Sequence, residues 1–324
     1  MTPAHRRPTI VDVAHAAGVS KSLVSAALRG DPGVSQASRD LILATADSLG
    51  YRRNGWAQRL VSGRSELVGV LLTDLRNAYQ TDVVNGIEDA ARDAGFGVIL
   101  SHGRRDRALL RERLAGLISL GVDAVIAVTG HLTEDDLCDA SSRVPLVVVG
   151  RPPSVPADAG WISNDDETGA RLALRHLIDA GHERIAHLYD SDRPAASARR
   201  AAYRSLATPA REYDSRHGGI ESLLEAVAGG SGPTAVFAAH DRLAARLIAD
   251  ATARGIRVPA DLAVVGYDNT DLADLMRITS VDQPRQRMGA DAMAMALALA
   301  AGETPAHVVA APTLILRDSS RSPA

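Results

Sequence analysis

The chain has a single cysteine, Cys138, among its 324 residues. One thiol forms no internal disulfide and supplies too few sulfur ligands for a structural zinc site. The N-terminal residues contain no apolar stretch of the kind found in signal peptides, and no apolar run reaches the roughly 20 residues of a membrane-spanning helix. These absences predict a protein of the reducing cytoplasm, with no structural metal and no membrane partner.

Aromatic residues make up only 3% of the chain, so its cores must be built mainly from Ala, Val, Leu and Ile. Apolar residues at 46% and charged residues at 23% are typical of a globular protein, and the length favours two or three domains. The sequence also lacks the G-x-S-x-G, P-loop and H-E-x-x-H patterns of common enzyme chemistry. We therefore expect neither an enzyme nor a cofactor.

Positive charge is in slight deficit overall, with a net charge of −3, but it is concentrated near the N-terminus. Residues 1–65 hold nine Lys and Arg against four Asp, whereas the rest of the chain has eight more acidic than basic residues. A small basic module on a larger acidic body is typical of a protein that reads a polyanion and has a second function elsewhere.

The N-terminal residues have the spacing of two helices that meet at a sharp turn. Thr9 and Asp12 form a T-x-x-D capping pattern ahead of an apolar-periodic helix, Gly18 ends that helix, and Ser20 caps a second one. One apolar interface joins them, formed by Val13, Ala14, Ala17, Val19, Val24 and Ala27. This spacing is typical of a helix-turn-helix, which presents its second helix to the major groove of DNA.

A third helix follows, capped by Ser35 and closed by Gly50. Its stripe is expected to face the core and consists of Leu41, Ala44, Ala46 and Leu49. The alternative is a helical hairpin with no nucleic-acid ligand. The basic surplus and the supporting third helix favour DNA binding instead.

The expected DNA contacts cluster around the start of the second helix. Lys21 and Ser22 lie at its exposed beginning, where base edges are reached. Ala26 lies one turn after Ser22 and is expected to touch a thymine methyl at most. Hydroxyl groups suited to phosphate oxygens belong to Thr9, Ser20 and Ser25.

These motifs make the chain resemble the lactose-repressor (LacI/GalR) family. The segment over residues 9–30, TIVDVAHAAGVSKSLVSAALRG, carries the likeness, followed by LGYRRN at 49–54 and GWAQRLVSGR at 55–64. Downstream motifs in the same order are AAHD at 238–241, VPADLAVVGYDN at 258–269 and TSVDQP at 279–284. Several ordered motifs together are more specific than any one alone.

The resemblance implies a multidomain fold. It consists of an all-α helix-turn-helix headpiece over residues 1–54, a hinge helix and linker over 55–65, and an α/β periplasmic-binding-protein-like core over 66–324. It also implies a homodimer on a pseudo-palindromic operator in double-stranded DNA. By the same resemblance Asn54 at the end of the headpiece and Ala57 in the hinge are DNA-binding residues, and Leu60 is a wedge that enters the minor groove. The alternative for Leu60 is a linker leucine packed on the core. Many family members have Arg where this chain has Ala26, so its base preference should differ.

From residue 67 apolar runs alternate with amphipathic helices, which predicts parallel α/β sheets. We expect strands at 67–73, 97–101, 124–129, 146–149, 184–188, 235–238 and 262–265. Expected helices cover 79–94, 107–120, 167–180, 241–254 and 285–301. They form two subdomains, roughly 66–160 and 161–280, with C-terminal crossovers and a cleft at the strand ends.

Polar residues that follow these strands are the candidates for binding a small-molecule effector. They are Asp74, Asn77, Tyr79, Asp241 and Asp268, and the resemblance adds Arg199 and Gln283. Carboxylates and an arginine facing one cleft suit a polyhydroxylated ligand such as a carbohydrate, with Tyr79 or Trp161 stacked on its apolar face. Alternatively, Asp74 and Asp268 only cap the helices that follow them.

The sequence thus predicts a transcriptional regulator, most simply a repressor, controlled by a small-molecule effector. A solute-binding protein for a transporter is one alternative, and the basic headpiece disfavours it. An α/β enzyme acting on a sugar is the other, and the missing catalytic pattern disfavours it.

Overall fold

The computed structural model describes residues 8–51 and 65–320. The chain divides into two compact units, Met1–Ser65 and Glu66–Ala324. Three residues predicted to bind DNA, Asn54, Ala57 and Leu60, lie outside the described residues.

The described part of the first unit, residues 8–51, contains three helices: α1 (Ile10–Ala17), α2 (Lys21–Arg29) and α3 (Gln36–Ser48). Thr9 and Asp12 form the predicted capping box on α1, and Gly18 ends that helix with a left-handed φ of 67°. A residue with a Cβ rarely adopts this conformation, which lets the chain turn sharply into α2. Ser20 and Ser35 cap α2 and α3 by accepting hydrogen bonds from the backbone N–H of Leu23 and Ser38.

The three helices surround a small apolar core. Its buried members are Val13, Ala14, Val24, Ala27, Val34, Ile42 and Ala46. The predicted interface between α1 and α2 is therefore present, but the expected stripe on α3 is correct only at Ala46. Leu41 is 51% exposed and Leu49 is 38% exposed, while Ile42 and Ala46, one turn apart, face the core.

The second unit holds two six-stranded sheets. In order across the first sheet lie β11 (His307–Ala310), β5 (Gly160–Asn164), β4 (Leu146–Val149), β3 (Ala124–Val128), β1 (Leu67–Leu72) and β2 (Gly97–His102). All its strand pairs are parallel. One face packs against α5 (Ala78–Asp93) and α13 (Arg285–Ala300), and the other against α6 (Arg107–Ser119) and α7 (Glu134–Ser141).

The second sheet has the order β12 (Thr313–Ile315), β10 (Thr279–Asp282), β9 (Ala263–Asp268), β8 (Ala235–Ala238), β6 (Ile185–Tyr189) and β7 (Arg211–Asp214). Only the pair of β10 with β12 is antiparallel in this sheet. Its two faces are covered by α8 (Asp166–Asp179) with α9 (Pro194–Leu206), and by α10 (Gly219–Ala228), α11 (Asp241–Ala253) and α12 (Asp271–Leu275). The expected α-helical headpiece and two-sheet α/β core are confirmed.

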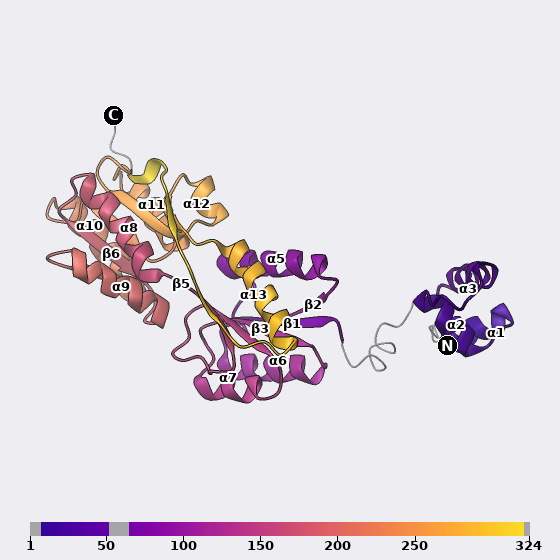
Figure 1. Cartoon of the computed structure of the whole chain (residues 1–324). Coiled ribbons are helices and arrows are strands. Elements are labelled where there is room, and N and C mark those ends of the chain that lie inside the picture. The colour runs from indigo at the N-terminus through magenta and orange to yellow at the C-terminus, as the bar shows by residue number, and fades with distance from the viewer. Residues whose placement is uncertain (1–7, 52–64, 321–324) are drawn as a thin grey trace, which may run out of the picture. The chain divides into compact units, whose positions relative to one another are not determined.

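The boundary between the two subdomains differs from the expectation. β5, over Gly160–Asn164, pairs with β4 in the first sheet, so the first subdomain extends past residue 160. The chain returns to this subdomain in α13 and β11 before β12 joins the second sheet, and Figure 1 shows this last segment in yellow running between the two sheets. Sequence periodicity does not register such crossovers because each one is only a few residues long.

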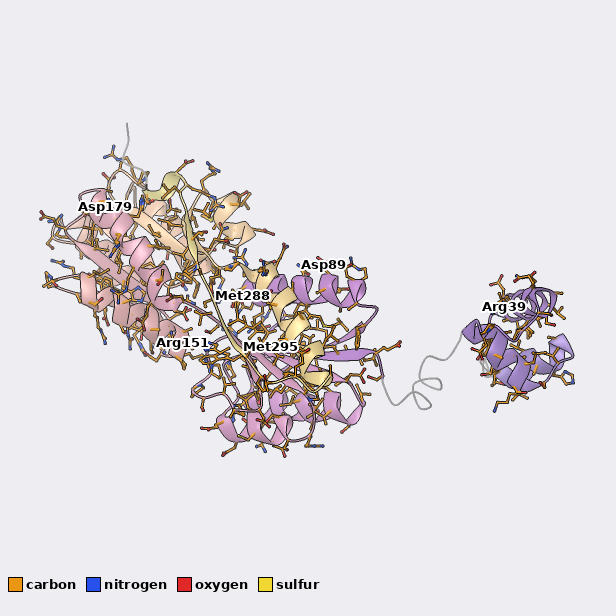
Figure 2. The ribbon with its side chains drawn as sticks, in the orientation of Figure 1. Arg39, Asp89, Arg151, Asp179, Met288 and Met295 are labelled. Atoms are coloured by element: carbon orange, nitrogen blue, oxygen red, sulfur yellow. The ribbon has the colours of Figure 1, made fainter. Side chains whose placement is uncertain are left out.

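α5 and α13 lie side by side over the first sheet (Figure 1). A Cβ on Gly86 would meet the backbone oxygen of Gln286 at 2.0 Å, and one on Gly289 would meet that of Val83 at 2.1 Å. Glycine is therefore required at both positions for this close approach. Met288 and Met295 lie on α13, as Figure 2 shows, and Met288 is buried in the first sheet's core. Over the described residues, no helix combines the length and apolar character needed to cross a bilayer.

Candidate functional site

A cleft of about 570 Å³ lies between the two subdomains, where the carboxyl ends of both sheets meet. Nine separate segments that each follow a strand contribute to its walls. The seven residues that the sequence predicts for the effector all line it: Asp74, Asn77, Tyr79, Arg199, Asp241, Asp268 and Gln283.

Asp74, directly after β1, binds two arginines rather than capping a helix. Its carboxylate lies 3.2 Å from a guanidinium nitrogen of Arg76 and 3.4 Å from one of Arg105. The hydrogen bond from Arg76 holds the pKa of this buried carboxyl below its usual value. The cap of α5 is Asn77, whose side-chain oxygen accepts from the N–H of Tyr79. The capping alternative for Asp74 therefore does not apply.

A row of hydrogen bonds crosses the floor of the cleft from the first subdomain to the second. The Asn164 amide donates to the hydroxyl of Tyr79, at 3.0 Å, and to the side-chain oxygen of Gln283. The amide nitrogen of Gln283 then donates to Asp268. Because Gln283 is only 1% exposed, it serves as an internal link between the two walls rather than as an open contact for a ligand.

Asp268 ends β9 with a φ of 97°, in the left-handed region that few non-glycine residues occupy. Burial raises the pKa of its carboxyl to about 6, although the nearby charge of Arg199 acts in the opposite direction. The cap of α12 is Thr270, so Asp268 does not cap that helix either. A strained, desolvated carboxyl on a cleft wall is typical of a ligand-binding group.

Arg199 is held from three sides. Its Nε donates to Asp166 at 2.9 Å, its Nη1 donates to the backbone oxygen of Ala239 at 2.7 Å, and its guanidinium lies 3.8 Å from the ring centre of Tyr267. A guanidinium on an aromatic face gains a cation–π contact and loses conformational freedom. The arginine is thus preorganised at the wall of the cleft.

Asp241 lies beneath the cleft and does not cap α11. It is 1% exposed and accepts hydrogen bonds from the hydroxyl and N–H of Thr270 and from the hydroxyl of Ser280. Burial raises the pKa of this carboxyl. The cap of α11 is His240, whose other ring nitrogen lies 2.9 Å from Asp190. Asp241 therefore fastens the loop after β9 to α11, and it also belongs to the lining of the cleft.

Trp161 was expected to stack on the ligand, and this prediction is wrong. Its ring stacks on His307, with ring centres 3.8 Å apart and planes 5° apart, and its Nε1 donates to the backbone oxygen of Gly150. It packs against the first sheet's core instead of lining the cleft. Only Tyr79 of the two predicted aromatic contacts reaches the cleft.

Sequence reasoning missed several polar residues of the cleft. They are Arg105, His131, Arg151, Asn164, Asp166, Asp190 and Arg193. Asn164 and Asp166 were detectable, since Asn164 ends β5 and Asp166 follows it, much as Asp74 follows β1. The strand 160–164 was not predicted because it is short and ends in the polar residues Ser163 and Asn164, so it does not form an apolar run.

The other predicted site is the exposed start of α2. Lys21 and Ser22 are exposed there, while Ser25 and Ala26 are half-buried. The hydroxyl of Ser20 accepts from the N–H of Leu23 at 3.2 Å and lies 3.0 Å from that of Ser22. The capping hydroxyl of Thr9 is likewise exposed, and it donates to Asp12.

Arg39 of α3 supports this helix from behind. Its guanidinium donates to the backbone oxygen of Ala27 at 3.1 Å and to that of Asp31 at 2.7 Å. These bonds fasten α3 to the last turn of α2 and to the turn that follows it. An α-helix fixed at its C-terminal end, with lysine and hydroxyl groups at its open beginning, has the shape and chemistry to enter a major groove.

Known proteins match both units of the chain. Residues 9–54 match the model of bacterial regulatory proteins of the lacI family, and residues 174–320 match that of a periplasmic binding protein-like domain. Catabolite control protein A of Priestia megaterium is 34% identical over 306 residues, which cover 88% of this chain and 90% of that protein.

Two solved structures extend the likeness over 97% of the chain. The lac repressor dimer bound to operator and the anti-inducer ONPF superposes with a TM-score of 0.83 at 26% identity, over 99% of its own length. The complex of the transcriptional regulator CelR with cellobiose has a TM-score of 0.68 at 30% identity and is covered completely, at 100%. The resemblance and the periplasmic-binding-protein-like fold expected from the sequence are confirmed, and the chain belongs to the LacI family of bacterial regulatory proteins.

Proposed function

We propose that this protein is a homodimeric transcriptional repressor whose affinity for its operator is set by a small polyhydroxylated effector bound in the cleft. The observation that carries the proposal is the convergence of all seven predicted effector residues on one cleft of about 570 Å³. A cavity of this size is in the range that holds small-molecule ligands. Two similar proteins support the proposal: the CelR structure contains cellobiose, a sugar, and the lac repressor dimer structure contains operator DNA.

The chemistry of the cleft suits a carbohydrate. Each sugar hydroxyl both donates and accepts a hydrogen bond, and the preorganised pair of Asp268 and Arg199 offers an acceptor and a donor on one wall. Tyr79 adds a half-buried aromatic ring on the opposite wall. Asp74, in the loop between β1 and α5, forms a second charged group in the cleft together with Arg76 and Arg105.

On the DNA side, Lys21 and Ser22 would contact base edges, and the hydroxyls of Thr9, Ser20 and Ser25 would contact phosphates. Family resemblance adds Asn54 of the headpiece and Ala57 of the hinge to the DNA-binding residues, and makes Leu60 a wedge between base steps. An effector that binds one arrangement of the two subdomains more tightly shifts the protein toward that arrangement and changes operator affinity.

The decisive experiment compares two single variants after the operator has been selected from genomic DNA fragments. Asp268→Ala should retain operator affinity but lose the response to the effector, because the cleft has lost an acceptor. Leu60→Ala should do the reverse, with effector binding intact and operator affinity reduced. Operator affinity is measured with and without effector by fluorescence anisotropy, and effector binding by calorimetry.

Each variant is the control for the other. An Asp268→Ala protein that responds to effector like the parent would remove Asp268 from the effector site. A Leu60→Ala protein with full operator affinity would remove the wedge from the mechanism. Sedimentation of the parent protein tests the assembly, and a stable tetramer at micromolar concentration would contradict the homodimer.

A further inference from the structure

Three basic side chains gather at one part of the cleft, and each comes from a different loop. Arg105 follows β2 and His131 follows β3 in the first subdomain, whereas Arg193 immediately precedes α9 in the second. All three line the cleft. An anion placed among them would therefore contact both subdomains at once.

Arg193 stands out because its guanidinium has no carboxylate partner within residues 65–320. Its one hydrogen bond goes to the backbone oxygen of Gly130 at 3.5 Å, which is at the outer limit for such a bond. This weak bond spans the cleft, since Gly130 follows β3 and Arg193 follows β6. A ligand with a stronger acceptor would displace it readily.

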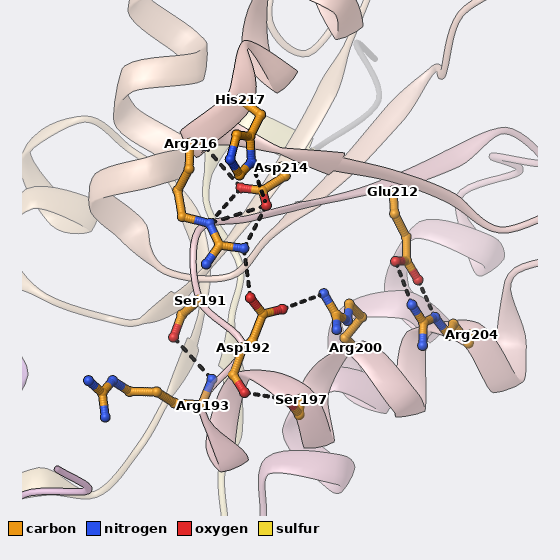
Figure 3. A network of polar contacts seen from close by, with 10 residues as sticks. All are labelled: Ser191, Asp192, Arg193, Ser197, Arg200, Arg204, Glu212, Asp214, Arg216 and His217. Carbon is orange, nitrogen blue, oxygen red and sulfur yellow. Dashed lines mark hydrogen bonds and ion pairs between the residues drawn. The ribbon is translucent and has the colours of Figure 1, made fainter.

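The other arginines of the adjacent polar network have carboxylate partners. Arg200 and Arg216 both bind Asp192, Arg216 also binds Asp214, and Arg204 binds Glu212. Figure 3 shows this network and shows the side chain of Arg193 extending away from it. Asp192 is adjacent in sequence but already has two arginine partners, so it leaves Arg193 free for the cleft.

The nearest acids of the cleft are also occupied. Asp74 is shared between Arg76 and Arg105, and Asp190 pairs with His240. Burial, followed by the charges of Arg193 and Arg105, lowers the pKa of His131 to about 4. The pKa of Arg193 is likewise lowered by burial and by the charge of Arg105. The two guanidinium groups thus repel each other, and of the two only Arg105 has a carboxylate partner, Asp74, within residues 65–320.

The backbone conformation at Arg105 also favours a ligand site at this part of the cleft. Arg104 and Arg105 are consecutive non-glycine residues with φ of 50° and 66°, in the left-handed region. The N–H of Arg105 donates to the backbone oxygen of Thr73 at 3.0 Å, which fixes this conformation beside Asp74. Strain that is retained at a ligand cleft is a feature of binding sites.

We propose that the effector is an acidic sugar, whose phosphate or carboxylate group binds between Arg193 and Arg105 while its hydroxyls meet Asp268 and Arg199. This inference rests on the proposed function and specifies its effector class. Guanidinium groups bind both anions through paired N–H donors, so phosphate and carboxylate share the same recognition chemistry. Because Arg105 belongs to the first subdomain and Arg193 to the second, an anion bound by both would hold the two subdomains together.

The test uses full-length protein and a matched panel of probes: glucose, glucose 6-phosphate, glucuronate and inorganic phosphate. Binding is measured by calorimetry and by the shift in melting temperature. We expect the anionic probes to bind and glucose to bind at least about tenfold more weakly than the better of its two acidic derivatives, since a charge-assisted bond is lost. Comparison of glucose 6-phosphate with glucuronate distinguishes a phosphate from a carboxylate.

Arg193→Gln and Arg105→Gln should each weaken binding of the anionic probes about tenfold or more. Arg193→Lys should restore part of the loss, because it returns the charge without the paired donors. Arg204→Gln is the matched control on α9, where the arginine binds Glu212 outside the cleft, and its affinity for the probes should equal that of the parent.

The proposal fails if no anionic probe binds the parent protein, or if the anionic probes bind Arg193→Gln as tightly as the parent. An uncharged sugar that binds and changes operator affinity would refute the acidic effector and leave the proposed function intact. Failure of the proposed function itself would look different, because then no small molecule, charged or neutral, would change operator affinity.

Discussion

The Nε of Arg285 lies 2.9 Å from the Oδ2 of Asp82, so the first residue of α13 is tied to α5. The same guanidinium donates to the backbone oxygen of Asn269 at 2.8 Å. Asn269 directly follows Asp268 in the second subdomain, whereas Asp82 belongs to the first. One arginine therefore joins the loop of a proposed effector contact to the helix pair of the other subdomain.

The ion pair of Asp82 with Arg285 should stabilise the fold measurably, because the Arg285 side chain is only 12% exposed and that of Asp82 is 30% exposed. A double-mutant cycle of Asp82→Asn and Arg285→Gln, read by chemical denaturation, should give a coupling energy of about 1 kcal/mol or more. A value indistinguishable from zero would mean that the pair behaves like an exposed ion pair and does not fasten α13 to α5.

Operator affinity should fall steeply with salt, because residues 1–65 carry a surplus of five positive charges. A headpiece that neutralises about five phosphates would lose about 500-fold in affinity over a fourfold rise in salt. Anisotropy titrations at several salt concentrations give the slope of this dependence. A flat dependence would argue that the basic surplus does not contact the DNA backbone.

Lys21 offers an unusually clean test of base recognition, since it is the only lysine in the chain. Lys21→Ala should relax the preference at one position of each half-site, with a cost of about 1–3 kcal/mol at that base pair. Binding to a panel of single-base operator variants measures this. An equal loss for every sequence would make Lys21 a phosphate contact.

The same lysine can be followed chemically. Operator DNA should protect the Lys21 amine from acetic anhydride, and mass spectrometry reads this at a single side chain. Acetylation removes the positive charge and should weaken operator binding. Unchanged labelling in saturating operator DNA would place Lys21 outside the interface.

Effector binding should weaken below neutral pH. The pKa of Asp268 is raised to about 6 by burial, so its carboxyl is mostly ionised at pH 7 and mostly protonated at pH 5. Only the ionised group accepts hydrogen bonds at both oxygens, and the ionised fraction falls about tenfold over this interval. Calorimetry should therefore show a loss of affinity approaching tenfold from pH 7 to pH 5. Asp268→Asn should bind more weakly and lose this pH dependence.

Much of this protein follows from local sequence. The capping box at Thr9, the left-handed turn at Gly18 and the alternation of apolar runs with amphipathic helices are short-range signals, and each led to the correct element. The rule that polar residues after parallel strands share one edge also placed five residues at the same cleft, and the family resemblance added Arg199 and Gln283. These features depend on neighbours a few residues apart, so the chain itself specifies them.

Other features depend on partners that are far apart in sequence. Sequence could not reveal that Gln283 links Asn164 to Asp268, that Asp241 is closed off by Thr270 and Ser280, or that Trp161 stacks on His307. An aspartate open to a ligand and one buried under hydroxyl groups look identical in a strand-end motif. Only the packing of distant segments decides which carboxyl loses its solvent and its hydrogen-bonding capacity, and therefore which one remains available to bind.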